Sequence, residues 1–297
     1  MGSGRQIVTF RTSSLSEDRA PAGDAIVGSE FAFSSQDFER IRTLLRQHTG
    51  ISLSEAKRSM VYSRLARRLR ATGKPSFSAY LEDLRVGAPE WESFVNALTT
   101  NLTYFYRESH HFQILADYLR RRAPAPGGQP LNIWCAAAST GEEAWTLAIT
   151  AAEAFGTLAP PVRIVATDLD THVLGTARQG LYRQDQLAKV PQALVRRYFC
   201  EEKNDLHGVR PELRALVSFR QLNLLDAVWP VRGPLDAVFC RNVLIYFDRT
   251  TQLRVVERMA GLMAPGSLLF VGHSENFSQG QQKFALQGRT VYMRSSL

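Results

Sequence analysis

Leu131-Asn-Ile-Trp-Cys-Ala-Ala-Ala-Ser-Thr-Gly-Glu-Glu143 decides the fold, because it reads as a buried strand, a loop of small residues and the start of a helix. The apolar run has the length of a strand, and the small residues after it let a ligand approach the backbone closely. Gly141 allows the tight entry into the helix that follows. A strand followed at once by a helix is the repeating unit of a parallel sheet.

The same alternation continues through the rest of the chain beyond a proline- and glycine-rich loop at 123–130. The spacing predicts strands and helices over these ranges: strands 131–136, 162–167, 235–240, 267–272 and 290–294, and helices 142–154, 171–179 and 249–263. Residues 198–222 mix single apolar residues with polar ones, which predicts a small antiparallel β insertion. We therefore expect an α/β domain with a mostly parallel sheet over 101–297.

Residues 31–100 show helical patterns only. A first helix starts at Ser34 and stops at Gly50, and the pair Ser52 and Glu55 repeats the capping pattern before a second, basic helix. Two further helices are expected at 76–84 and 89–98. This part of the chain is predicted to be a separate small all-helical domain.

The composition limits the number of domains and the class of protein to which the chain can belong. With 297 residues and 44% hydrophobic residues, the chain can form one large domain and a smaller one. Residues 1–30 are rich in Ser, Gly, Ala and Pro, and we expect a mobile tail there. Neither a membrane-spanning run nor a signal peptide is recognisable, so a cytoplasmic location is expected. Cys135, Cys200 and Cys240 lack paired metal-ligand spacing, which favours buried, reduced thiols and no metal site.

The net charge of +8 arises from 36 basic and 28 acidic residues, and much of the excess lies on the second helix. Such a charge attracts nucleic acid, an anionic lipid surface or an acidic protein. At 100° per residue, Lys57, Arg64 and Arg68 share one face while Leu65 turns toward a core. The alternative to a partner-binding surface is an ordinary helix face that is exposed to solvent and binds no partner.

Candidate ligand-binding residues follow the strands, because ligands of open parallel sheets bind beyond the carboxyl ends of the strands. Glu142 and Glu143 at the helix start would repel a phosphate, which favours a cationic ligand without phosphate, although they also complement the helix dipole. Asp168 can accept hydrogen bonds from the hydroxyls of a ribose, or it caps the next helix.

Two further places carry polar groups at strand ends. Asn223-Leu224 can read the edge of an adenine and cover its face, or it is an ordinary turn. In Cys240-Arg-Asn-Val-Leu-Ile-Tyr-Phe247, polar groups interrupt an apolar stretch, which is unfavourable unless something binds there.

Five motifs, in order, resemble those of the CheR-type chemotaxis receptor methyltransferases. They are Asn101-Leu-Thr-Tyr-Phe-Tyr-Arg-Glu108, Ala136-Ala-Ala-Ser-Thr-Gly-Glu-Glu143, Ala166-Thr-Asp-Leu-Asp170, Cys240-Arg-Asn-Val-Leu-Ile-Tyr-Phe-Asp248 and Gly272-His-Ser-Glu-Asn-Phe277. The resemblance implies a Rossmann-like class I methyltransferase domain, a small N-terminal all-helical domain and a small antiparallel β insertion. It also implies methylation of glutamate side chains on receptors, with S-adenosyl-L-methionine as donor, S-adenosyl-L-homocysteine as product and no metal.

The resemblance also implies roles for particular residues. The donor would be held by Asn101, Thr103, Arg107, Glu143, Asp168, Asn223, Leu224, Arg241 and Asn242. Arg107 and Tyr246 would lie beside the departing methyl group and position the acceptor carboxylate. The acidic methylation helices of receptors would meet the basic helix through Lys57, Arg64, Arg67 and Arg68. Charge reversal at Arg64 and Arg68 is then expected to weaken receptor methylation and leave donor binding intact.

The sequence also carries expectations about the oligomeric state, the partners and the rival functions. A monomer is expected, without insertion into a membrane. Some members of the family that the chain resembles bind a tethering peptide at the receptor C-terminus with the β insertion. In this chain the insertion is a few residues shorter around 201–210 than in some of those members. A nucleic-acid methyltransferase is the chief rival, but no Asn-Pro-Pro-Tyr or catalytic Pro-Cys motif for base chemistry is seen, so we expect no nucleic-acid partner. A donor-binding sensor without catalysis is the other rival.

Overall fold

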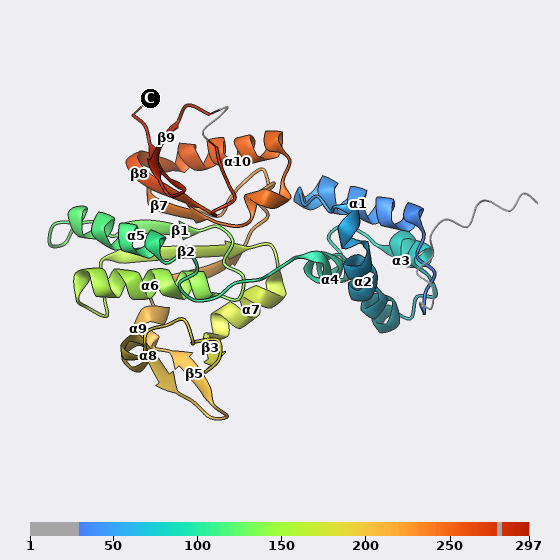
Figure 1. Cartoon of the computed structure of the whole chain (residues 1–297), viewed down its shortest axis with the longest axis horizontal. Helices are drawn as coiled ribbons and strands as arrows, with labels where there is room; N and C mark the ends of the chain where they lie inside the picture. Colours follow the sequence, from blue (N-terminus) through green and yellow to red (C-terminus); the bar gives the residue numbers. More distant parts are fainter. Residues whose placement is uncertain (1–29, 278–280, 297) are drawn as a thin grey trace, which may run out of the picture.

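The structure is a computed structural model, and it describes residues 30–277 and 281–296. The predicted tail lies outside the described residues, apart from Glu30. A helical unit, α1 to α4, lies beside a larger domain built around a central sheet (Figure 1).

The helical unit begins as the sequence predicts. Helix α1 (Ser35–Thr49) starts at a capping box in which the Ser34 side chain accepts the Asp37 N–H and the Asp37 carboxylate accepts the Ser34 N–H. It ends at Gly50, whose φ of 76° is in the left-handed region. Both predicted ends of this helix are confirmed.

The start of the basic helix differs from the prediction. Helix α2 (Arg58–Thr72) follows a 3-10 turn, η1 (Glu55–Lys57). The N-cap of η1 is Ser54 and that of α2 is Lys57, and neither side chain makes a capping hydrogen bond. The capping pair proposed at Ser52 and Glu55 is wrong, because the Ser52 N–H instead donates to the carbonyl oxygen of Tyr246 at 2.9 Å in the other domain. Helices α3 (Phe77–Asp83) and α4 (Pro89–Leu98) complete the unit.

The central sheet has seven strands in the order β6-β2-β1-β7-β8-β10-β9. The five parallel strands are β6 (Val217–Gln221), β2 (Val162–Asp168), β1 (Leu131–Cys135), β7 (Leu235–Cys240) and β8 (Met263–Val271), and the antiparallel pair is β10 (Val291–Arg294) and β9 (Phe284–Gly288). The carboxyl ends of β1, β2 and β7 lie side by side, because Cys135 is in register with both Ala166 and Phe239.

Both faces of the sheet are covered. In β1, Ile133 and Cys135 belong to one buried cluster and Trp134 to the other, as the two-residue period of a strand requires. Helices α5 (His110–Arg121) and α6 (Glu142–Phe155) pack on the first face, and α10 (Arg249–Leu262) packs on the second (Figure 1). Helix α7 (Thr171–Gln179) follows β2.

The bounds predicted for the β insertion are wrong. The three-stranded antiparallel sheet comprises β3 (Leu181–Arg183), β5 (Leu206–Val209) and β4 (Phe199–Glu201), accompanied by α8 (Gln192–Tyr198) and followed by α9 (Pro211–Arg214). Residues 217–221, included in the predicted insertion, form β6 of the main sheet and pair in parallel with β2. A strand at the edge of a sheet is only partly covered, so its sequence lacks the apolar run of its neighbours.

Candidate functional site

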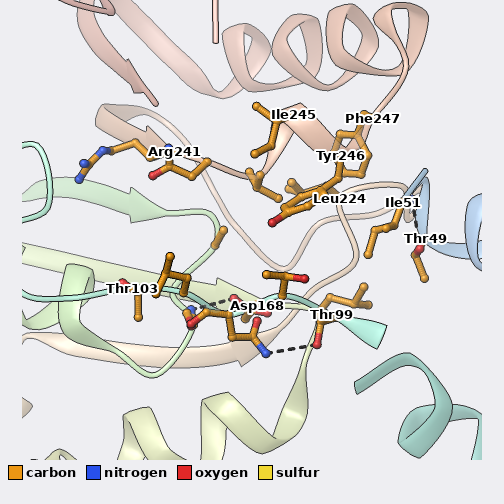
Figure 2. A pocket seen from close by; sticks show the side chains of 18 of the residues that line it. Thr49, Ile51, Thr99, Thr103, Asp168, Leu224, Arg241, Ile245, Tyr246 and Phe247 are labelled. Atoms are coloured by element: carbon orange, nitrogen blue, oxygen red, sulfur yellow. Dashed lines mark hydrogen bonds between the residues drawn. The ribbon is translucent and has the colours of Figure 1, made fainter. Parts of the chain in front are cut away.

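A cavity of about 350 Å³ lies at the carboxyl ends of the parallel strands, facing the helical unit (Figure 2). Every residue predicted to hold the donor lines it, as does Tyr246: Asn101, Thr103, Arg107, Glu143, Asp168, Asn223, Leu224, Arg241 and Asn242. Residues from the loop after α1, including Ile51 and Leu53, close the opposite wall. The topology therefore brings the predicted donor and acceptor residues together, although they lie up to 145 positions apart in the chain, from Asn101 to Tyr246.

Asp168 ends strand β2 with its carboxylate in the cavity. The carboxylate accepts the N–H of Ser139 at 2.8 Å and the N–H of Asp170 at 3.0 Å. The cap of the next helix is Asp170, whose side chain accepts the N–H groups of His172 and Val173, so the alternative of Asp168 as a cap is wrong. Burial raises the pKa of Asp168 to about 6, against the opposing effect of the two backbone hydrogen bonds.

Glu143 and Arg241 form a buried ion pair on the floor of the cavity. An Nη atom of Arg241 lies 2.9 Å from the Glu143 carboxylate, and the Arg241 side chain is only 1% exposed. Glu143 also accepts the S–H of Cys135 at 3.2 Å. Burial raises the pKa of Glu143, and the Arg241 charge opposes that shift. Glu142 does not line the cavity, because its carboxylate accepts the hydroxyl of Thr140 at 2.6 Å.

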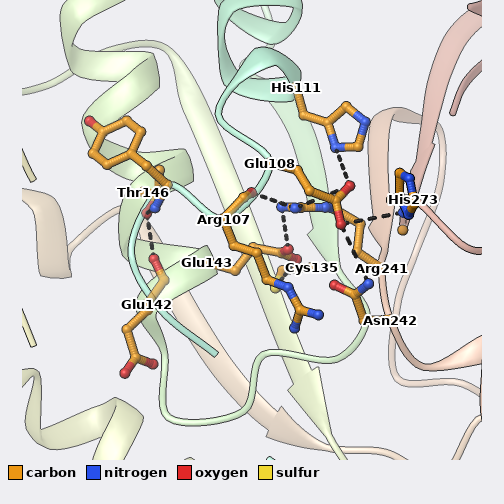
Figure 3. Close-up of polar contacts among 12 residues, drawn as sticks. Arg107, Glu108, His111, Cys135, Glu142, Glu143, Thr146, Arg241, Asn242 and His273 are labelled. Atoms are coloured by element: carbon orange, nitrogen blue, oxygen red, sulfur yellow. Dashed lines mark hydrogen bonds and ion pairs between the residues drawn. The ribbon is translucent and has the colours of Figure 1, made fainter. Parts of the chain in front are cut away.

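Arg241 also connects the neighbouring polar groups (Figure 3). Its guanidinium donates to the carbonyl oxygen of Arg107, lies 3.6 Å from the Glu108 carboxylate and sits over the ring of Phe112. The Nε atom of Arg241 is buried and has no hydrogen-bond partner within the described part of the chain. A buried cluster with an unused donor is typical of a site that binds a polar ligand.

Arg107 lies at the end of the segment that links the two domains. One Nη atom donates to the carbonyl oxygen of Leu102 at 2.9 Å, and the guanidinium lies 6.0 Å from the centre of the Tyr104 ring. The flanking residues Tyr106 and Glu108 have positive φ angles of 58° and 55°. Non-glycine residues rarely adopt this conformation, and it is found where surrounding contacts fix a functional segment.

Asn101 and Asn223 tie the cavity wall to neighbouring elements. The Asn101 amide donates to Asp170 at 2.8 Å, and the Asn101 carbonyl oxygen accepts the Ser139 hydroxyl at 3.1 Å. The Asn223 amide donates to the carbonyl oxygen of His48 at 2.6 Å, and its oxygen accepts the N–H of Leu225 at 2.9 Å. Asn223 is thus a turn residue and a cavity residue at once.

Glu275 supports the cavity wall, although the motif at 272–277 that contains it was assigned no role from the sequence. Its carboxylate accepts the N–H groups of Asn242 at 2.9 Å, Leu244 at 2.8 Å and Ile245 at 3.2 Å, and also that of Gly272. It thereby fixes the turn that carries η2 (Leu244–Tyr246). A glutamate in a predicted loop directly after a buried strand was the available signal, but only the fold shows which backbone it meets.

The four basic residues predicted to face a receptor have different surroundings. An Nη atom of Arg64 donates to the carbonyl oxygens of Ala97 at 3.2 Å and Thr99 at 2.5 Å. Arg68 binds Glu90 through two hydrogen bonds, of 3.0 and 2.6 Å. Arg67 and Lys57 are exposed, and Lys57 also lines the cavity. Arg64 and Arg68 therefore stabilise the helical domain itself.

The cavity suits a nucleoside that carries a cationic group and no phosphate. Asp168 offers a buried acceptor for ribose hydroxyls, while the carboxylate of Glu143 lies at the helix start where a phosphate would otherwise bind. A mostly parallel sheet with such a cavity at the carboxyl ends of its strands defines the class as an α/β domain that binds a nucleotide or a nucleoside.

Comparison with known proteins identifies the family. Residues 101–293 match the family model described as "CheR methyltransferase, SAM binding domain", and residues 36–99 match "CheR methyltransferase, all-alpha domain". The chain therefore belongs to the CheR methyltransferase family, whose larger domain binds S-adenosylmethionine.

Curated relatives extend over nearly the whole chain. Chemotaxis protein methyltransferase 2 of Pseudomonas aeruginosa is 51% identical over 89% of this chain and 94% of its own length. The chemotaxis protein methyltransferase of Klebsiella aerogenes is 46% identical over 95% of this chain and 97% of its own. The Escherichia coli protein of the same name is 47% identical over 89% of this chain and 92% of its own.

In residues 30–277 and 281–296, no helix has the length and apolar character needed to cross a bilayer. Within the same ranges, no three His, Cys, Asp or Glu side chains gather in a way that could hold a metal ion.

Proposed function

We propose that this protein transfers a methyl group from S-adenosylmethionine to glutamate side chains of chemotaxis receptors in the cytoplasm, giving glutamate methyl esters. The observation that carries the proposal is that one cavity is lined both by the carboxylates of Asp168 and Glu143 and by the side chains of Arg107 and Tyr246. The names of the curated relatives support chemotaxis as the setting.

The donor half of the proposal assigns a role to each group of residues. Asp168 accepts hydrogen bonds from ribose hydroxyls, Asn223 reads the adenine edge and Leu224 covers the adenine face. Glu143 and Arg241 hold the polar end of the donor, together with Asn101, Thr103 and Asn242. S-adenosylmethionine supplies, when bound, an electrophilic methyl group on a sulfonium, and S-adenosylhomocysteine is the product. No metal is assigned a role.

On the side of the methyl acceptor, the reaction requires the glutamate carboxylate to be positioned and does not require a proton transfer. A glutamate carboxylate has a reference pKa of about 4.3 and is therefore already ionised near neutral pH, so no general base is required. Arg107 can hold one carboxylate oxygen and leave the other free to attack, with Tyr246 beside it. Such alignment can supply roughly 7 to 11 kcal/mol of the barrier lowering.

Partner assignments follow from the same proposal. The acidic methylation helices of receptors would approach the side of the protein that carries Lys57 and Arg67, and the protein would act as a monomer. A receptor C-terminal tethering peptide, if used, would meet the three-stranded sheet. Comparison of an intact receptor with one lacking its last residues tests the tether.

Incubation of the purified protein with methyl-labelled donor, receptor-containing membranes and total RNA tests the proposed reaction. Base-labile label on the receptor, absent with the Asp168→Asn variant, is the expected result. Label in RNA would instead support a nucleic-acid methyltransferase. Donor binding without transfer to either acceptor would support a sensor.

A further inference from the structure

The opening of the cavity has an unusual set of exposed residues. Within the described part of the chain, the lining residues that are exposed to solvent are Ser52, Ser54, Lys57, Thr100, Leu102, Tyr104 and Ile245. Three of these are large and apolar or aromatic, one is a cation and none is a carboxylate. We refer to Leu102, Tyr104 and Ile245 as the apolar rim.

Exposure of the apolar rim is not explained by packing. Leu102 is 75% exposed, Ile245 49% and Tyr104 42%, and only three other large hydrophobic residues in the described ranges are as exposed: Val86, Val228 and Leu286. None of those three lines the cavity. Apolar side chains gathered around one opening mark an interaction surface, whereas single ones are ordinary.

The backbone beneath the rim is fixed by the catalytic machinery. The carbonyl oxygen of Leu102 accepts the Arg107 guanidinium at 2.9 Å, and that of Tyr104 accepts the Arg107 N–H at 3.3 Å. Across the cavity, the N–H of Ile245 donates to Glu275 at 3.2 Å. The apolar rim therefore comes from two separate segments of the chain. One also carries Arg107 and the other Tyr246, the residues proposed to position the methyl-accepting carboxylate.

We propose that the apolar rim binds the aliphatic side chains that flank the target glutamate on the receptor, and thereby selects which glutamates are methylated. This proposal rests on the proposed function. The preferred acceptor would be a protein segment that presents one carboxylate to Arg107 and aliphatic neighbours to Leu102, Tyr104 and Ile245. Lys57 is the exposed charge among the described lining residues, so acidic neighbours are tolerated and basic neighbours are repelled.

A nucleic-acid strand fits the rim less well. Phosphate contacts dominate the affinity of such complexes and require several cations along the binding surface. The described rim offers Lys57 alone beside three apolar side chains and three hydroxyl-bearing residues.

The test uses the full-length protein, intact receptor in membranes and S-adenosylhomocysteine. Leu102→Ser, Ile245→Ser and the double variant are compared with Val228→Ser, a control at a position that is 82% exposed and outside the cavity lining. We expect the double variant to lower kcat/KM for receptor methylation about tenfold or more, mainly through KM, because apolar contact to the acceptor is lost. Calorimetric affinity for S-adenosylhomocysteine should stay within about twofold of the starting protein.

Several outcomes would overturn the proposal. Receptor methylation within about twofold of the starting protein in the double variant would show that the rim makes no productive contact. A parallel loss of S-adenosylhomocysteine affinity would assign the rim to the donor site instead. Leu102→Met should retain activity, and a loss as large as that of Leu102→Ser would indicate a structural role. Absence of receptor label with the starting protein would contradict the proposed function itself, and label in RNA that depends on Leu102 and Ile245 would replace the protein acceptor with a nucleic acid.

Discussion

At the scale of single residues, the burial of Asp168 opposes the charge of its carboxyl group. Burial raises its pKa to about 6 in the ligand-free protein, so it takes up a proton as the pH falls through that value. A protonated carboxyl group accepts hydrogen bonds from ribose hydroxyls less well than a carboxylate does.

We therefore predict that the affinity for S-adenosylhomocysteine falls about tenfold between pH 7 and pH 5, as linkage to one proton requires. Calorimetry across this range measures the effect. Asp168→Asn should bind weakly with little dependence on pH. The pKa of Glu143 is also raised by burial, so Glu143→Gln is the second control and should keep the pH dependence if Asp168 is responsible. Equal affinity of the starting protein at both pH values would contradict this assignment.

Glu275 is the residue that fixes the turn between β7 and η2. It is 4% exposed, and its carboxylate accepts four backbone N–H groups within hydrogen-bond distance. A glutamine would offer one acceptor oxygen and place its NH2 group against some of these donors.

We predict that Glu275→Gln lowers the free energy of unfolding by about 1–3 kcal/mol, the cost of leaving buried donors unsatisfied. It should also weaken S-adenosylhomocysteine binding, because Asn242 loses its support. Urea denaturation and calorimetry measure the two effects. The matched control is Glu257→Gln, since Glu257 on α10 is exposed and pairs only with Lys283 among the described residues. A Glu275→Gln variant as stable as that control would show that the turn holds without the carboxylate.

At the scale of elements, α2 carries arginines that bind the helical domain itself beside an exposed one, and its sequence does not separate them. The charge-reversal test expected from the sequence, at Arg64 and Arg68, would place carboxylates beside the carbonyl oxygens of Ala97 and Thr99 and beside Glu90. Both changes would destabilise the helical domain, and a change at Arg64 would also disturb the segment leading to Asn101. Loss of methylation in these variants would not report on receptor contact.

Arg67 gives the cleaner test of the basic surface, because it is exposed on the same helix. We predict that Arg67→Glu lowers kcat/KM for receptor methylation several-fold at low ionic strength, with unfolding and donor binding unchanged, since it reverses a charge that attracts an acidic partner. The difference should shrink in high salt, which screens exposed charges. Arg68→Glu is the comparison, and it should lower the melting temperature. Methylation by Arg67→Glu that equals the starting protein at low salt would remove α2 from the receptor-binding surface.

At the scale of the whole molecule, the helical domain is part of the site. Ser52 donates to the carbonyl oxygen of Tyr246 at 2.9 Å, Asn223 donates to that of His48 at 2.6 Å, and Thr99 binds Asp170 at 2.6 Å. The first two contacts hold the end of α1 and the loop after it against the open end of the sheet, and the third holds the end of α4 there. Ile51 in that loop lies at the cavity (Figure 2), and Leu53 also lines it. The donor would therefore bind between two domains rather than on one.

The sequence by itself determined helix α1, the central strands and the order of the chemistry along the chain, whereas α5 and β9 were not predicted. Apolar runs of strand length, capping residues such as Ser34 and stops such as Gly50 act locally, so helix α1 and the central strands were predicted within a few residues. Ligands of parallel sheets bind beyond the strand ends, which is why Asp168 and Arg241 could be singled out before the fold was known.

Only the tertiary structure decided which polar residues line the cavity and which make structural contacts elsewhere. Strand β6 joins the main sheet by pairing with β2. Because an edge strand has few buried positions, its sequence lacks the apolar run that would have predicted this pairing. Asp170 takes the capping role that leaves Asp168 free, Glu275 meets a turn more than 30 residues away, and Arg64 bonds to α4 rather than to solvent. The cap at Asp170 is local, but the pairing of β6, the contacts of Glu275 and those of Arg64 join segments distant in the chain, so the packing of the folded chain sets their partners.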